Sequence, residues 1–198
     1  MTQLRAHGDS GQAFPIYITV VAGLLFLALA YLAVGQAAVN RSGAQTAADA
    51  AALAAAQETR DRLTDRWLAD LSDPTKWQDI FAGKGSGDDC WRAEQLAAEN
   101  DATLLGCTPG PLNYEVKVET NKPIGDSVVP GVADTKSTES ARAVIKALCD
   151  LPGGGAVDDA LPQLKCGDKT WTVNPDDRAG LPGPGDLFDV HLATNDEG

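Results

Sequence analysis

Four cysteines are the residues of this chain whose type and spacing could support covalent chemistry. Cys90 and Cys107 are 17 positions apart, and so are Cys149 and Cys166. An even number of cysteines in a small acidic domain is typical of disulfides formed in an oxidising compartment. Three pairings are open, and the sequential one is favoured because it closes two local loops. Each such loop stabilises a fold by about 3 kcal/mol in the chain-entropy treatment.

A zinc site is the alternative use of these cysteines. The chain has no Cys-x-x-Cys pair, and its histidines are His7 and His191, so the usual zinc-ligand spacing is missing. His191 lies in the alternating run FDVHLA, which indicates an ordinary strand position and not a general base. The sequence predicts no metal and no cofactor.

A search for catalytic motifs gives a negative result. The chain contains no Gly-x-Ser-x-Gly turn, no phosphate-binding loop and no His-Glu-x-x-His pair. The glycines at 153–155 follow a proline and precede acidic residues, which indicates a linker. Carboxylates are numerous, but the sequence places no pair of them in a cleft. We therefore expect no enzyme.

The net charge of the chain limits its partners. The formal charge is −12 over 198 residues. Arg5 and Asp9 cancel near the N-terminus, so the acidic excess lies in the remainder of the chain. Nucleic-acid binding is excluded because phosphate contacts require lysine and arginine. An acidic surface on an exported domain favours solubility.

The chemistry-bearing residues all follow one uncharged run, Phe14–Val39. A hydrocarbon core of about 30 Å needs roughly 20 apolar residues, and only a helix satisfies its own backbone in lipid. A secretory signal peptide is the alternative, but the run exceeds the roughly 7–15 residues of a signal core and no cleavage pattern follows. The sequence predicts an uncleaved transmembrane helix at 14–39 after a cytoplasmic lead at 1–13.

The orientation of this single-pass anchor in the cell membrane follows mainly from the cysteines. Arg5 and His7 precede the run and Arg41 follows it, so the positive-inside rule gives only a small bias. All four cysteines lie beyond the anchor. We expect a cytoplasmic N-terminus and an extracellular C-terminal domain.

An alanine-rich segment at 40–71 continues the helix. Alanine is the strongest helix former, and no proline occurs before Pro74. One helix over 16–71 would be about 84 Å long. Residues spaced by four form a smooth face that suits close approach of another helix: Gly43, Ala47, Ala51 and Ala55. Plain helix propensity is the alternative reading. Glu58 and Arg62 are spaced as a surface ion pair.

The segment 72–198 is expected to form a small disulfide-bearing α+β domain with an antiparallel sheet. A strand at 112–120 alternates, with Tyr114, Val116, Val118 and Thr120 on one face. The segment 138–148 fits a helix or a strand; we favour a strand that pairs with 112–120. The other expectations are a loop at 72–89, a helix at 91–103, turns at 107–111, long connections at 121–137 and 151–162, a hairpin at 164–166 and 169–173, and an extended or one-turn segment at 186–192.

The stretch around the anchor resembles a known family. AQTAADAAALAAA at 44–56, directly after an N-terminal anchor, is similar to the signature of the TadE/TadG-like proteins of tight-adherence (Flp) pilus systems, especially their actinobacterial forms. The similarity covers about a quarter of the chain. It implies a minor pilin or pseudopilin that contacts other pilins or pilus-assembly membrane proteins through its N-terminal helix, and it implies no catalysis.

The chain departs from the pilin pattern at its processing site. Pilins of this group are cut after a glycine, with a glutamate at the fifth position of the product. Gly11 and Gln12 could form such a site, but Ile16 stands at the glutamate position. We expect the chain to stay uncut. The leading hypothesis is a membrane-anchored minor-pilin-like subunit. An anchored extracellular binding module outside any filament is the alternative, and an anchored hydrolase is third.

Overall fold

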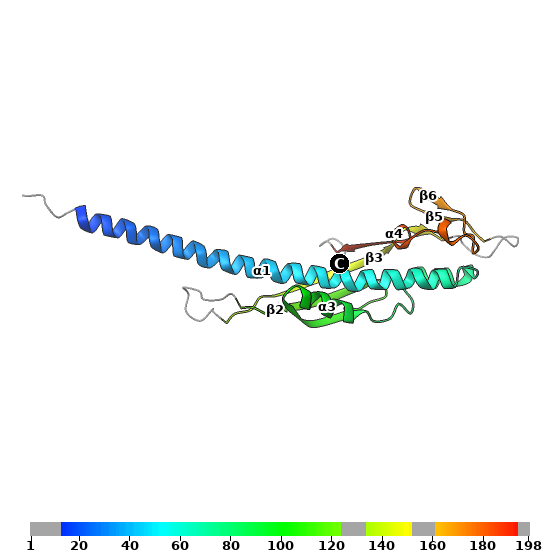
Figure 1. Ribbon diagram of the computed structural model, residues 1–198, viewed down its shortest axis with the longest axis horizontal. Coiled ribbons are helices and arrows are strands. Elements are labelled where there is room, and N and C mark those ends of the chain that lie inside the picture. The colour runs from blue at the N-terminus through cyan, green and yellow to red at the C-terminus, as the bar shows by residue number, and fades with distance from the viewer. Residues whose placement is uncertain (1–12, 124–133, 152–160, 194–198) are drawn as a thin grey trace, which may run out of the picture.

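The computed structural model describes residues 13–123, 134–151 and 161–193. One helix dominates it: α1 (Ala13–Ala69) runs for 57 residues without a break. Its first half projects away from the rest of the molecule, and its second half lies against the folded domain (Figure 1). The expected continuous helix over 16–71 is therefore present, with slightly different bounds. The architecture is α+β, as the sequence predicts.

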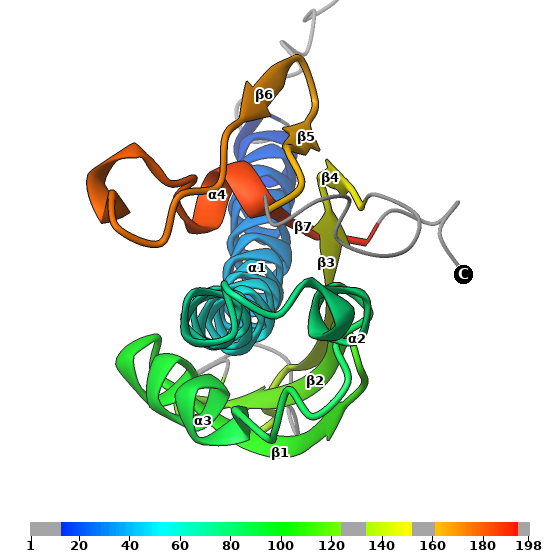
Figure 2. The same ribbon diagram turned by 90° about the vertical axis from the view of Figure 1, so that its right-hand side faces the viewer.

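A four-stranded antiparallel sheet packs on the second half of α1. Its strands are β1 (Ala102–Pro109), β2 (Asn113–Thr120), β3 (Thr138–Ala147) and β7 (Phe188–Leu192), in the order β1-β2-β3-β7. Figure 2 looks along α1 and shows α3, β1 and β2 on one side of the helix, with β3, β7 and α4 continuing around it. The sheet therefore partly encloses α1.

The central strands confirm two predictions. The side chains of Tyr114, Val116, Val118 and Thr120 are buried on one face of β2. The ambiguous segment 138–148 forms β3, which pairs antiparallel with β2 so that Val116 faces Ala141. Pairing with β2 selects the strand over the helix, because the hydrogen-bond ladder between β2 and β3 satisfies the backbone N–H and C=O groups of this segment. The local periodicity of the sequence does not distinguish the two.

Smaller elements complete the domain. A second sheet contains β4 (Cys149–Asp150), β5 (Leu164–Cys166) and β6 (Lys169–Trp171), in the order β4-β5-β6. The β5–β6 hairpin lies where the sequence predicts it. The helical elements are η1 (Pro74–Lys76), α2 (Trp77–Phe81), α3 (Cys90–Glu99), η2 (Arg178–Gly180) and α4 (Pro184–Leu187). The segment expected at 186–192 contains both a helical turn and a strand.

Three local predictions are wrong. The segment 72–89 is not only loop, because η1 and α2 lie within it. Trp77, Ile80 and Phe81 of α2 are buried, and this burial stabilises a helix too short to form alone. The helix expected at 91–103 ends at Glu99, where Asp101 has φ 55°. The turns expected at 107–111 belong mostly to β1, because pairing with β2 extends that strand to Pro109.

The core lies between α1 and the elements around it. Trp67 of α1 contacts Trp77 of α2 edge to face, with ring centroids 5.7 Å apart. Phe81 and Phe188 are stacked at 4.9 Å. These contacts join the end of α1 to α2, and α2 to β7. Phe81 and Phe188 are more than 100 positions apart in the sequence. The end of the long helix is therefore fully integrated into the domain.

Both disulfides have the sequential pairing. Cys90–Cys107 joins the first turn of α3 to β1, and Cys149–Cys166 joins β4 to β5, where the two residues lie opposite each other. All four cysteines are used, so none remains for the alternative zinc site. Among the described residues no cluster of histidine, cysteine or carboxylate side chains could hold a metal.

Candidate functional site: the apolar half of the long helix

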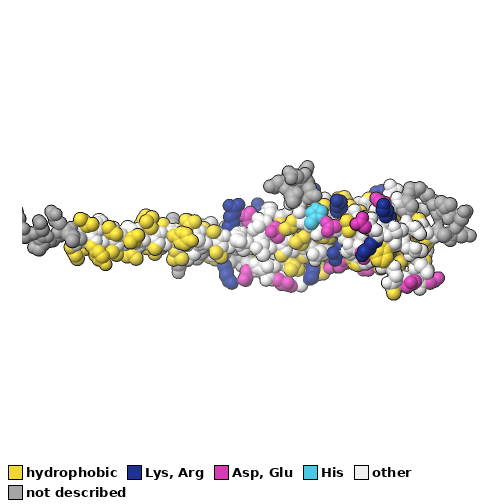
Figure 3. All heavy atoms as spheres, turned by 90° about the horizontal axis from the view of Figure 1, so that it is seen from above, with side chains coloured by type: hydrophobic (Ala, Val, Ile, Leu, Met, Phe, Trp, Pro, Cys, Tyr) yellow, Lys and Arg dark blue, Asp and Glu magenta, His cyan; other side chains and the backbone are white. Residues whose placement is uncertain are grey.

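The first half of α1 presents an uncovered apolar surface on every side. Large side chains from Phe14 to Val39 are exposed, including Tyr31 at 83% and Val39 at 74%. Figure 3 shows this hydrophobic surface along the helix and the first charged side chains where the domain begins. The segment is long and apolar enough to cross a membrane, and none of it is buried in the molecule. A surface of this size requires lipid or protein around it.

The second half of α1 is covered by the chain's own domain. Seven alanines of this half have no exposed surface: Ala44, Ala47, Ala48, Ala51, Ala52, Ala55 and Ala56. The expected docking face for a partner helix is therefore occupied, because Ala47, Ala51 and Ala55 are buried in this domain. Gly43 lies just outside it, and a Cβ added there would meet nothing within 4 Å. The small side chains here allow the chain's own domain to pack closely against the helix backbone.

The transition from apolar helix to domain occurs within a few residues. Asn40 Nδ2 donates to the backbone oxygen of Lys122 at 3.1 Å, and Thr120 Oγ1 donates to Asn40 Oδ1 at 3.3 Å. Arg41 Nε pairs with Glu139 Oε1 at 2.8 Å. These contacts attach the helix to the end of β2 and the start of β3 as soon as the uncharged run ends. No stalk separates the anchor from the domain.

A buried polar network holds the far half of α1 against the domain. Asp89 and Thr59 are completely buried, and Thr59 Oγ1 donates to Asp89 Oδ2 at 2.6 Å. The Asp89 N–H donates to Tyr114 Oη at 3.2 Å, so the Tyr114 hydroxyl donates to Thr59 Oγ1 at 2.8 Å. Arg62 Nη2 pairs with Asp89 Oδ1. Burial raises the pKa of Tyr114, although its hydrogen bonds with Thr59 and with the Asp89 N–H oppose this.

Two arginines of α1 fasten the loop that precedes α3. Arg66 Nη1 donates to the backbone oxygens of Lys84 and Gly85 at 2.7 and 2.9 Å, and Arg62 Nη1 donates to that of Ser86 at 3.3 Å. Gly87 has φ +90°, and a Cβ there would lie 2.4 Å from Arg62 Nη1. Glycine is favoured at this position because residues with a side chain rarely adopt φ +90°.

Sequence reasoning missed this network. It placed Arg62 in a surface pair with Glu58, whereas Arg62 binds Asp89. Asp89 directly precedes α3, where an acidic residue is typical of a helix N-cap. Its side chain makes no capping bond and turns to α1 instead. No local pattern could have indicated that destination.

The remaining candidate residues form no catalytic arrangement in the described part of the chain. His191 lies in edge strand β7, and its Nδ1 contacts Asp189 Oδ2 at 2.8 Å. An open groove of about 330 Å³ lies between α1 and α3, and Leu53, Gln57, Asp61 and Arg92 are among its lining residues. It contains no nucleophile paired with a base. The predicted processing site at Gly11 and Gln12 lies outside the described residues.

The long helix contains nearly all of the part of the chain that matches a known family. Residues 11–58, about a quarter of the chain, match the family described as putative Flp pilus-assembly TadE/G-like. The N-terminal segment is TadE/G-like. This segment comprises the whole apolar half of α1 and the alanine-rich turns that enter the domain. The TadE/G-like match connects the chain to pilus assembly. No curated protein and no solved structure matches the chain.

Proposed function

We propose that this chain is a membrane-anchored, minor-pilin-like subunit of a tight-adherence pilus or secretion apparatus. The observation that carries the proposal is the division of α1. Its TadE/G-like first half is apolar and uncovered, whereas its second half is the core of a folded domain. Such a helix can lie in a bilayer before assembly and pack against apolar helices of other pilins afterwards, because both environments cover the same surface.

The proposed division places residues 1–13 in the cytoplasm, 14–39 in the membrane, 40–71 in the helix extension and 72–198 in the extracellular domain. Two disulfides in this domain support an oxidising environment. Assembly partners would therefore contact the uncovered turns of 14–39. The alanine face at 44–56 is not offered as their docking site, because the domain already covers it.

The proposal includes an uncut N-terminus. In a pilin with the family's glutamate, that carboxylate could pair with the new amine of a neighbouring subunit after cleavage. Ile16 cannot form this pair, so cleavage between Gly11 and Gln12 would bring little gain. An uncut minor subunit fits this sequence better than a processed, repeated filament subunit.

Filament shearing tests the proposal. Surface filaments would be sheared from cells, and the protein quantified by mass spectrometry in sheared and membrane fractions, with a polytopic membrane protein as the control for contamination. A pilus subunit is recovered with the filaments in excess of that control. Recovery only with the membrane would support the alternative, an anchored binding module. The intact mass of the same protein reports processing, and a form that begins at Gln12 would contradict an uncut N-terminus.

A further inference from the structure

The end of the domain nearest the anchor lies at a defined depth relative to the apolar helix. Asn40 is the first residue after the uncharged run, and its side chain bonds to the Lys122 backbone and to the Thr120 hydroxyl. Arg41 follows and pairs with Glu139. The ends of β2 and β3 therefore sit level with the point where α1 leaves its apolar segment.

The dimensions of a bilayer place this level among the lipid headgroups. The run Phe14–Val39 rises about 39 Å at 1.5 Å per residue. A hydrocarbon core is about 30 Å thick, and the bilayer with its headgroups is about 40–45 Å thick. With the run spanning the core, Asn40 and Arg41 lie in the headgroup layer. Lys122 must lie in the same layer because its backbone is bonded to Asn40.

The charges of the described residues at this end nearly balance, unlike those of the whole chain. Arg41 pairs with Glu139 at 2.8 Å, Lys122 with Asp101 at 3.4 Å and Lys136 with Glu119 at 3.4 Å. Asp134 is a further acid in this region. In a chain with a net charge of −12, this near-neutral end is the one that approaches the bilayer, so it avoids the repulsion that the acidic remainder of the domain would experience at anionic lipid.

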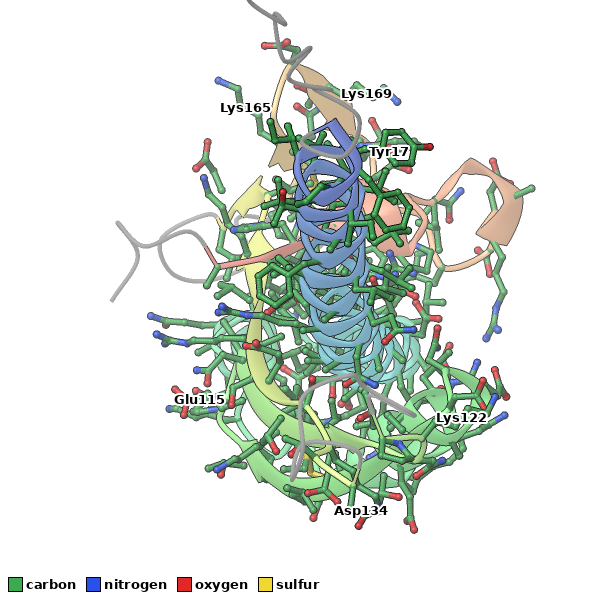
Figure 4. All side chains as sticks on the ribbon, turned by 90° about the vertical axis from the view of Figure 1, so that its left-hand side faces the viewer. Tyr17, Glu115, Lys122, Asp134, Lys165 and Lys169 are labelled. Atoms are coloured by element: carbon green, nitrogen blue, oxygen red, sulfur yellow. A yellow bond between two sulfur atoms is a disulfide. The ribbon has the colours of Figure 1, made fainter. Side chains whose placement is uncertain are left out.

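Two cationic side chains at this end are largely exposed. The Arg41 side chain is 77% exposed, whereas that of its partner Glu139 is 21% exposed. The Lys122 side chain is 79% exposed, and that of its partner Asp101 is 75% exposed. Figure 4 views the molecule from the N-terminal end of α1 and shows Lys122 and Asp134 on the part of the domain beside the helix. A guanidinium and an ammonium are thus free to turn toward phosphate oxygens, which both bind well.

We propose that this membrane-facing end, defined by Asn40, Arg41, Lys122 and Lys136, is a binding surface for phospholipid headgroups. Arg41 and Lys122 bind lipid phosphate, and the domain rests on the bilayer in one orientation. The proposal depends on the membrane anchoring proposed above. It adds a second contact with the membrane, made by the folded domain itself.

Lysine reactivity in the unmodified full chain tests this surface. The chain would be reconstituted in vesicles of phosphatidylcholine and phosphatidylglycerol, or kept in an uncharged detergent, and acetylated briefly with a water-soluble reagent. Peptide mass spectrometry would give the rates at Lys122 and Lys84. Lys84 is a matched control: it is 68% exposed and paired with Asp79 at 2.7 Å. It lies beside Arg66, about 38 Å along the helix from Arg41.

The expected result is a several-fold fall in the Lys122-to-Lys84 rate ratio in vesicles relative to detergent. Because both lysines are in one molecule, the ratio cancels differences in vesicle orientation. An unchanged ratio in chains that float with the vesicles would overturn the headgroup surface while leaving the anchor intact. Failure to float would instead overturn the proposed anchoring, and this surface with it. If the rate ratio fell equally in vesicles of uncharged glycolipid, phosphate binding would be overturned, because steric cover by the bilayer would then explain the slower reaction of Lys122.

Discussion

Asp89 is the residue on which the attachment of α1 to the domain depends most. Its carboxylate is completely buried and is satisfied by Arg62 and by the Thr59 hydroxyl, while its backbone N–H binds Tyr114. Asp89 is buried and the Arg62 side chain is 38% exposed, and an ion pair with a buried member contributes little net stability because desolvation offsets the attraction. Removal of one partner is costly, because it leaves the other charge without compensation. The network therefore acts as a specific lock between α1, the loop before α3, and β2.

Replacement of the arginine tests this lock. We expect Arg62→Met to lower the free energy of unfolding by about 3 kcal/mol, because Asp89 would remain buried without its counter-charge. Arg60→Met is the matched control, since Arg60 pairs with the half-exposed Asp61 at 2.8 Å and should cost less than about 1 kcal/mol. Urea unfolding of the full chain in mild detergent, followed by tryptophan fluorescence, would measure both. Equal losses would contradict the role given to Asp89.

The raised pKa of Tyr114 predicts a pH dependence. Burial raises this pKa above its ordinary value of 10.0, so the unfolded chain loses the phenolic proton first as pH rises. The stabilisation is complete below pH 10 and is lost as pH rises through the folded-state pKa. We expect Tyr114→Phe to cost about 1–2 kcal/mol at neutral pH and to reduce the fall in stability above pH 10. Unfolding of both proteins across this range checks the sign; parallel curves would contradict it.

At the scale of elements, the alanine-rich half of α1 shows how small side chains serve the fold. A helix face that carries only methyl groups allows neighbouring elements to approach its backbone closely. Burial is complete at Ala47, Ala51 and Ala55 and absent at Gly43. Residues with the same four-residue spacing are therefore exposed before the domain begins and buried against it afterwards.

A pair of leucine substitutions separates these roles. Ala51→Leu adds three carbon atoms to a closely packed site and should destabilise the domain by about 1–3 kcal/mol. Gly43→Leu adds a larger side chain where a Cβ meets nothing within 4 Å, and it should be neutral or stabilising by up to about 1 kcal/mol because leucine favours helix. Thermal unfolding of the full chain in detergent would compare them. A stable Ala51→Leu protein would mean that the sheet does not pack on this face.

At the scale of the molecule, α1 joins anchor and domain as one body. No proline interrupts the helix between Ile16 and Ala69, and Asn40 and Arg41 bind the domain where the apolar run ends. A force or displacement applied to the anchor would therefore reach the domain directly through a helix. This arrangement suits a subunit that is moved from bilayer to assembly, because the domain keeps its orientation relative to its anchor.

The proposed orientation gives a topological prediction. With the domain outside, a membrane-impermeant protease added to intact spheroplasts should remove residues beyond the anchor and leave a short membrane-bound fragment, detected by mass spectrometry. A cytoplasmic protein of the same cells is the control for intact membranes. Digestion of the domain only after detergent lysis would mean that the domain faces the cytoplasm, which would reverse the orientation.

Several features were predictable from sequence because they depend on local chemistry. The uncharged run Phe14–Val39 determines an exposed apolar helix, and an alanine-rich and then proline-free sequence continues it to Ala69. Alternation in 112–120 determines which face of β2 is buried. The local cysteine spacing favoured the pairing that the structure has.

Tertiary structure decided what depends on distant partners. Strand β3 required β2, and α2 required the core into which Trp77 and Phe81 pack. The alanine face packs against the chain's own domain and not against a partner helix. The Asp89 side chain binds α1 and does not cap α3, because a buried carboxylate is costly unless it is paired and hydrogen-bonded, and Arg62 and Thr59 of α1 lie next to it in space. Sequence determines propensity and polarity along the chain; which surfaces meet is a property of the complete fold, because burial is satisfied by residues far apart in sequence.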